Sequence, residues 1–373
     1  SQSNKSLDAR QFLGLAPFLR HSIAGEPLQP LATAFLATAE CQPDNANVWL
    51  NLSLVLQCLD QRDLGLAMQA EALSLQQIFE LPARQQPAVC RVLMLMAPGD
   101  VAENTPLECL LEDGDIDLVF YYLIDGQAAP PPLPEHDVWL VAMGDSPRNR
   151  QTLAALEPVL QAWPRPVLNW PEFIPLTERT EASIRLYGAP GVAIPVTWRA
   201  SRAQLVVVAA GQQRLDDFFP ECDFPIIIRP QGSQAGRDLL RVSAPDELAA
   251  YLAQVDSAQF FVAKFIDYRG ADGFFRKIRI AFVGGQPFIC HMAVSSNWMV
   301  HYVNAGMYED AGKRAEEAHV MDDFGKFVER HQAALQAIFE RLPLDYFCID
   351  CAELPDGQLM VFEADHVMVV HAM

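Results

Sequence analysis

Three carboxylates near the C-terminal end of the sequence have types and spacing suited to binding a hard cation. The segment DYFCIDCAELPDGQLMVFEAD (345–365) reads as two strands joined at the tripeptide PDG. If a four-residue loop joins them, Asp350 faces Val361. Asp350, Glu363 and Asp365 then share one face of the hairpin, and the other face is apolar. Mg²⁺ binds oxygen ligands of this kind together with substrate phosphates. The alternative is a strand whose acidic residues face solvent.

A glycine-rich segment with flanking arginines could bind phosphate. It is RPQGSQAGR (229–237), and it follows the apolar run at 224–228. Gly232 and Gly236 allow backbone N–H groups to approach an anion, and Ser233 adds a hydroxyl. The segment matches neither the Walker loop nor the dinucleotide-binding fingerprint, so both of those sites are excluded here. The alternative is an ordinary surface turn.

A second basic segment alternates charged and apolar residues. In RKIR (276–279), alternation places Lys277 and Arg279 on one face of a strand. Basic side chains in a strand of an acidic protein require an anionic partner. That partner is either an acidic residue on a neighbouring strand or a bound phosphate.

Short apolar runs predict the strands that position these segments. Runs at 90–98, 115–123 and 137–145, a helix at 149–162 and a fourth strand from 166 predict a parallel α/β domain over residues 84–198. A second α/β unit starts near residue 203 and includes a strand at 259–267. A hairpin over 274–294 turns at Gly284-Gly285, and a helical segment follows at 316–341. The predicted fold class is therefore α/β (α+β).

Residues 1–83 are predicted to be helical throughout. Apolar residues recur at spacings of three and four, and PDN (43–45) separates two helical stretches. The spacing of Trp49, Leu52, Gly65 and Ala72 is close to that of a tetratricopeptide helical hairpin. Two interpretations follow: a plain helical cap on an enzyme, or a module that docks a peptide or protein partner.

In this order, these segments resemble the ATP-grasp superfamily of carboxylate–amine ligases, in particular its RimK-like members. The resemblance spans about residues 88–373. The segment 224–236 is similar to the phosphate-covering lid, AKFID (263–267) to the adenine-binding segment, and ID…VFEAD (349–365) to the metal-binding hairpin. The family's earlier phosphate-contacting Lys has no clear match in this chain, and Arg179 is the best candidate for it. The chain also departs from the family pattern at three further positions. Arg229 replaces the usual Lys, Lys264 stands where an acid is frequent, and Asp365 replaces the usual Asn.

The resemblance implies an ATP-grasp fold with an N-terminal all-α helical-hairpin domain. The implied domains are a helical domain (1–83), a pre-ATP-grasp domain (84–198), a lid subdomain (199–262) and a C-terminal metal-binding subdomain (263–373). The implied reaction is ATP-dependent: a carboxylate is activated as an acylphosphate and joined to an amine, with release of ADP and phosphate. The carboxylate and the amine are small molecules or peptides. A homodimer is also implied.

The resemblance further implies a role for each site residue. Two Mg²⁺ ions would bind Asp350, Glu363 and Asp365. The catalytic residues would be Arg279, which stabilises the transferring phosphoryl group, and Arg229, which holds the α- and β-phosphates. ATP would contact Arg179, Arg229, Gly232, Ser233, Gly236, Lys264, Phe265 and Ile266. The substrate would contact His291, Ser295, Trp298, His301 and Asn304. For the two histidines, satisfied core residues are an equally weighted alternative.

Composition narrows the function classes. With 27 Lys and Arg against 47 Asp and Glu, the net charge is −20, which disfavours nucleic-acid binding. No apolar run is long enough to span a membrane, and the eight cysteines lie in apolar runs, as reduced thiols do. We therefore expect a cytoplasmic protein. Two other hypotheses remain: an ATP-grasp kinase or phosphotransferase, and a non-catalytic nucleotide-binding scaffold that uses its helical region to bind a protein.

Overall fold

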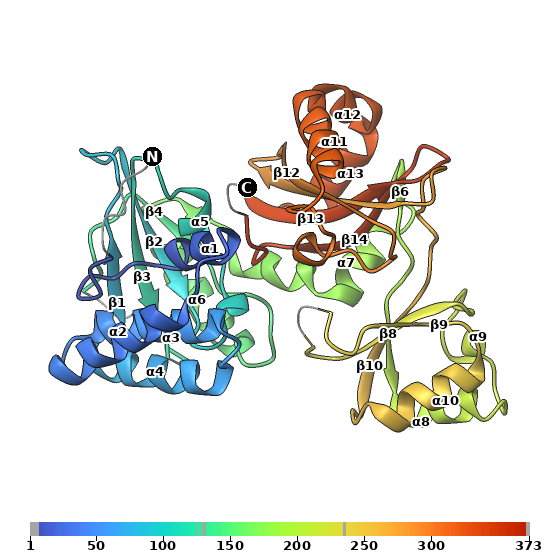
Figure 1. Ribbon diagram of the computed structural model, residues 1–373, viewed down its shortest axis with the longest axis horizontal. Coiled ribbons are helices and arrows are strands. Elements are labelled where there is room, and N and C mark those ends of the chain that lie inside the picture. The colour runs from blue at the N-terminus through green and yellow to red at the C-terminus, as the bar shows by residue number, and fades with distance from the viewer. Residues whose placement is uncertain (1–6, 125, 128, 130–131, 234–235, 371–373) are drawn as a thin grey trace.

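The computed structural model describes residues 7–124, 126–127, 129, 132–233 and 236–370. These residues form a mixed α/β protein with three sheets (Figure 1). All eight cysteines are free thiols, as predicted. Within the described ranges, no helix combines the length and apolarity needed to cross a bilayer.

The first sheet is mostly parallel, with strand order β1-β3-β2-β4-β5 and β1 antiparallel at one edge. Its strands are β1 (Ile78–Leu81), β2 (Cys90–Met96), β3 (Ile116–Tyr122), β4 (Val138–Val141) and β5 (Val167–Leu168). The four strands predicted from apolar runs are confirmed. The runs are continuous because both faces of this sheet are buried.

Helices α1 to α4 cover one face of this sheet (Figure 1). They span α1 (Ala16–Ile23), α2 (Gln29–Cys41), α3 (Ala46–Cys58) and α4 (Arg62–Leu75). Phe18 and Val48 from the helices share one apolar core with Met94 and Phe120 from the sheet. The helices and the sheet therefore bury each other's apolar surface. The prediction of helix throughout residues 1–83 is wrong at both ends of the described part, because residues 7–15 are not helical and residues 78–81 pair with β3.

Helix α6 packs against the opposite face of the first sheet, within the largest apolar core. The other helices of this region are α5 (Leu107–Leu110), α6 (Arg150–Ala162), α7 (Arg179–Leu186) and the short 3₁₀ turns Val101–Glu103 and Pro171–Thr177. The same core continues into the third sheet, where it includes Ile280 and Phe347. The first and third sheets therefore pack around one continuous hydrophobic core.

The second sheet is a smaller antiparallel unit with its own core, visible as a separate lobe in Figure 1. Its order is β7-β10-β8-β9, with β7 (Trp198–Ser201), β8 (Ile226–Pro230), β9 (Leu240–Val242) and β10 (Gln259–Lys264). Its helices are α8 (Arg202–Ala209), α9 (Leu215–Phe218) and α10 (Pro245–Gln254). The apolar run at 204–211 lies mostly in α8, which begins at a capping box formed by Ser201 and Gln204.

The third sheet has the order β12-β11-β13-β14-β6. Its strands are β6 (Val192–Ala193), β11 (Phe275–Val283), β12 (Gln286–Ser295), β13 (Tyr346–Glu353) and β14 (Leu359–Asp365). The predicted helical segment at 316–341 forms most of α11 (Ala311–Asp322), α12 (Phe324–Arg330) and α13 (Gln332–Arg341), and a 3₁₀ turn spans Tyr302–Asn304. The hairpin turn at Gly284-Gly285 is confirmed, since both glycines have positive φ and join β11 to β12.

The register of the last hairpin differs from the prediction. Glu353 pairs with Leu359, so the loop has five residues and shifts the pairing by one. A β-bulge next to Asp350 then leaves Phe362 as an extra, unpaired residue of β14. Beyond the bulge, Glu363 and Asp365 therefore lie on the same face as Asp350, as predicted. Asp350 consequently faces Glu363, where Val361 was predicted. The three carboxylates do share one face of the sheet, but they do so through two compensating irregularities.

Candidate functional site

A cleft of about 450 Å³ lies between the second and third sheets. Its walls come from β8 and β10 on one side and from β11, β13 and β14 on the other, with segments 298–301 and 367–369 completing it. Most of the predicted site residues line it: Arg179, Arg229, Gly236, Lys264, Phe265, Ile266, Arg279, Trp298, His301, Asp350, Glu363 and Asp365. The fold therefore brings together residues that are up to 186 positions apart in the sequence (365 − 179 = 186).

Asp350 is the most deeply buried of these groups, with 1% of its surface exposed. The Arg279 guanidinium donates to both of its oxygens, at 2.8 and 3.0 Å, and Lys277 Nζ lies 3.3 Å from Oδ2. Burial opposes the charge of Asp350, but Arg279 and Lys277 outweigh it and hold the pKa of this carboxyl below its usual value. Lys277 and Arg279 thus have an acidic partner on the neighbouring strand, one of the two partners expected from the sequence.

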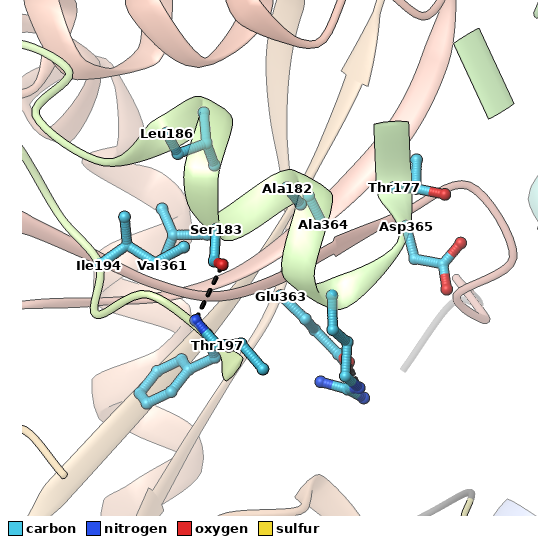
Figure 2. A pocket seen from close by; sticks show the side chains of 12 residues that line it. Thr177, Ala182, Ser183, Leu186, Ile194, Thr197, Val361, Glu363, Ala364 and Asp365 are labelled. Carbon is cyan, nitrogen blue, oxygen red and sulfur yellow. Dashed lines mark hydrogen bonds and ion pairs between the residues drawn. The ribbon is translucent and has the colours of Figure 1, made fainter. Parts of the chain in front are cut away.

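Glu363 and Asp365 are more accessible, with 30% and 35% of their side chains exposed. Arg179 Nη2, at the start of α7, lies 2.6 Å from Glu363 Oε2. Figure 2 shows both carboxylates at the edge of a small recess between α7 and β14. In the same view, Thr197 N–H donates to Ser183 Oγ at 2.9 Å. This hydrogen bond connects α7 to the segment that precedes β7 of the second sheet.

The donor chemistry of this hairpin fits Mg²⁺, but the three carboxylates do not converge. Among the residues that the structure describes, no three His, Cys, Asp or Glu side chains are grouped closely enough to hold a metal ion. Glu363 and Asp365 offer accessible oxygen atoms, and phosphate oxygens commonly complete such a site. Both oxygens of Asp350 already accept from cations.

The glycine-rich loop closes one side of the cleft. Arg229 donates to the Ser233 carbonyl at 2.9 Å and to its hydroxyl at 3.3 Å, so the loop backbone orients the guanidinium. Burial, assisted by Arg179 nearby, lowers the pKa of Arg229 to about 10. Gly236 has a φ of +72°, and a Cβ there would lie 2.8 Å from His301 Nε2. Gly236 therefore allows the loop to contact His301. Residues 234 and 235 of this loop lie outside the described part.

Part of the cleft lining is apolar. Phe265 is buried and lies under the Arg241 guanidinium, 4.3 Å from the ring centroid, with the Trp298 ring 5.8 Å away. Ile227, Ala263 and Ile266 also line the cleft. An aromatic, uncharged group such as a nucleobase fits this surface by burial and stacking.

Three predicted substrate residues do not line the cleft. His291 is buried against the Tyr302 ring, the Ser295 hydroxyl accepts from Asn297 N–H, and Asn304 is exposed in a 3₁₀ turn. Gly232 and Ser233 also lie outside the lining, although Ser233 orients Arg229. The predicted set omitted Lys277, whose alternation with Arg279 was the available signal. It also omitted segment 367–369, which has no recognisable sequence signal.

Comparisons with known proteins give weak similarity to solved structures only. No protein-family model matches the chain, and no curated protein does. D-alanine–D-alanine ligase from Bacillus anthracis, complexed with ATP, is 15% identical, with 75% of this chain and 86% of that chain covered and a TM-score of 0.45. A RimK domain ATP-grasp protein from Sphaerobacter thermophilus is 15% identical, with 75% and 92% covered and a TM-score of 0.42.

A third match is the VanG D-Ala:D-Ser ligase from Enterococcus faecalis, 12% identical, with 74% and 90% covered and a TM-score of 0.44. Because all three TM-scores are below 0.5, the functional assignment rests on the geometry of the cleft.

Proposed function

We propose that this chain is an ATP-dependent carboxylate–amine ligase that releases ADP and phosphate. The observation that carries this proposal is the composition of the cleft between the second and third sheets. Its cationic side chains are Arg179, Arg229, Lys264, Lys277 and Arg279, and the same lining contains two accessible carboxylates and apolar side chains. A triphosphate with an attached nucleobase matches this distribution of charge and apolar surface.

In the proposed reaction, the protein supplies positioning and charge neutralisation. Arg229, oriented by Ser233, and Arg179 would contact the phosphates, and Arg279 would neutralise charge on the phosphoryl group as it moves to the substrate carboxylate. Glu363 and Asp365 would hold Mg²⁺ with the nucleotide, and the metal would supply further charge neutralisation. Closure of the glycine-rich loop would exclude water, which otherwise hydrolyses the acylphosphate.

The direct test is nucleotide release from ATP and Mg²⁺ in the presence of a deproteinised metabolite extract. We expect ADP, and no AMP, to form only when extract is present. Fractionation of the extract would then identify the carboxylate and the amine.

Glu363→Gln is the matched variant for this assay. It should lose turnover and keep the wild-type circular dichroism spectrum, because the change removes one charge at a part-exposed site. If the wild type turns over no nucleotide and calorimetry detects no binding of Mg-ATP, the ligase proposal is wrong. A protein-binding scaffold then becomes the better account.

A further inference from the structure

The contacts of Asp350 differ in kind from those of the other two carboxylates on its face. Asp350 is paired in register with Arg279 on β11, and the guanidinium meets its carboxylate through two parallel hydrogen bonds. Lys277 lies two residues earlier on the same face of β11, and its Nζ is 3.3 Å from Asp350 Oδ2. Both oxygens of Asp350 therefore already contact cations, and 1% of its surface is exposed.

Arg279 is itself fixed on a second side. Its Nη1 donates to the Val369 carbonyl at 2.9 Å, so two neighbouring elements hold the guanidinium in one orientation. Burial opposes the charge of Arg279, but Asp350 outweighs it and raises the pKa of the guanidinium. The side chain remains charged and rigid at the wall of the cleft.

We propose that Asp350 is a positioning residue that holds Arg279 and Lys277 together as an anion-binding pair, and that any metal bound with nucleotide is held by Glu363 and Asp365 without Asp350. This inference rests on the proposed function, because it assigns the residues of the same cleft. Two cations and one carboxylate leave a net charge of +1 on this group of three side chains. The anion that fits is a phosphoryl group or the carboxylate that receives it.

Further cations line the same cleft as the pair. They are Arg179, Arg229 and Lys264. His301 also lines the cleft, and burial, followed by Lys277, lowers its pKa, whereas Asp350 and Glu363 act in the opposite direction. Asp350 prevents the two cations from separating, so little ordering is needed when the anion binds.

The first test measures metal affinity separately from turnover. Mn²⁺ binding to the wild-type protein in the presence of ADP is measured by electron paramagnetic resonance, and again in Glu363→Gln, Asp365→Asn and Asp350→Asn. We expect roughly tenfold weaker Mn²⁺ binding in the first two variants and a change of less than about threefold in Asp350→Asn. Equal losses in Asp350→Asn and Glu363→Gln would overturn the proposal.

Lys277→Met provides a second test that leaves the Arg279–Asp350 pair intact. If Asp350 were a metal ligand, Lys277 would compete with the ion, and its removal would tighten Mn²⁺ binding. We expect unchanged Mn²⁺ affinity and roughly tenfold weaker binding of inorganic pyrophosphate by calorimetry. Tighter Mn²⁺ binding, or unchanged pyrophosphate binding, would contradict the proposal.

The pyrophosphate measurement requires no nucleotide and no substrate. A wild type that binds pyrophosphate but not Mn²⁺-ADP would therefore refute the ligase function and leave the anion-binding pair supported. If the wild type binds Mn²⁺-ADP and Lys277→Met binds pyrophosphate as tightly as the wild type does, the anion-binding pair is refuted. The proposed ligase function is then unaffected.

Discussion

The first and third sheets differ in what their central strands present to their surroundings. In β2, successive residues Val92, Leu93, Met94 and Leu95 are all buried, in alternation between two apolar cores. In β11, Ile278 and Ile280 enter a core, but Lys277 and Arg279 face the cleft. The comparison teaches that a continuous apolar strand is covered on both faces, whereas charge alternating with apolar residues marks a face that borders the cleft.

The largest effect is expected from a substitution that removes a cation from the charged face of β11. Arg279→Met leaves the buried Asp350 with Lys277 as its remaining cation, and we expect a loss of about 3–5 kcal/mol in the free energy of unfolding. ADP release should also be lost. Urea unfolding and the nucleotide assay measure the two effects.

The matched control is Arg269→Met, since Arg269 pairs with Asp267 at the exposed surface. It should change neither quantity appreciably. If Arg279→Met were as stable as wild type, the charged face would contribute nothing to folding, and the contrast between the sheets would concern function alone.

The next effect tests Glu108, a buried acid beside the first sheet that forms no ion pair with the residues the structure describes. Glu108 Oε1 accepts from Leu15 N–H, and burial raises the pKa of Glu108 to about 7. The native state thus retains a proton that the unfolded chain releases near its ordinary value, about 4.3. Stability contributed at low pH is therefore lost as pH rises from about 4 to about 7.

Glu108→Gln removes this titration. The difference in unfolding free energy between the variant and wild type should shift in favour of the variant by about 2–3 kcal/mol between pH 4.5 and pH 8. Denaturant titrations across that range measure it, with the exposed Glu40→Gln as control. A pH-independent difference would show that Glu108 is not a buried, shifted acid.

A smaller effect concerns the loop above the charged face. Gly232 and Gly236 both have positive φ, but only at Gly236 would a Cβ meet His301. Gly232→Ala should weaken nucleotide affinity roughly fivefold through backbone strain of about 1 kcal/mol. Gly236→Ala should weaken it further through the contact with His301. Calorimetry with Mg-ATP compares the two, and equal losses would indicate that the loop does not approach His301.

The smallest effect is expected for Arg229→Lys. The positive charge is kept, but the two contacts with Ser233 are lost and the phosphate loses a planar donor. We expect the KM for ATP to rise a few-fold, about 1 kcal/mol or less, with kcat nearly unchanged. An equal fall in kcat would mean that Arg229 acts on the transferring phosphoryl group and belongs with Arg279.

Turns and buried strands with strong local sequence signals were predictable from the sequence. The pairing of strands that are far apart in the sequence was predictable only in part. The Gly284-Gly285 turn and the apolar strands of the first sheet have strong local signals, and the structure confirms them. The short edge strand β1 has no such signal, because its place is set by pairing with β3. The association of Asp350 with Lys277 and Arg279 depends on which strands become neighbours, which no spacing within one hairpin specifies.

The compensating irregularities in the last hairpin make the direction of its carboxylates depend on a single extra residue. With the five-residue loop but no bulge, Asp350 would pair with Phe362, and Glu363 and Asp365 would turn towards the apolar core. Deletion of Phe362 would straighten the strand and keep Asp350 opposite Glu363. A chain whose strand straightened without that deletion would bury two carboxylates, although none of the charged side chains had been altered.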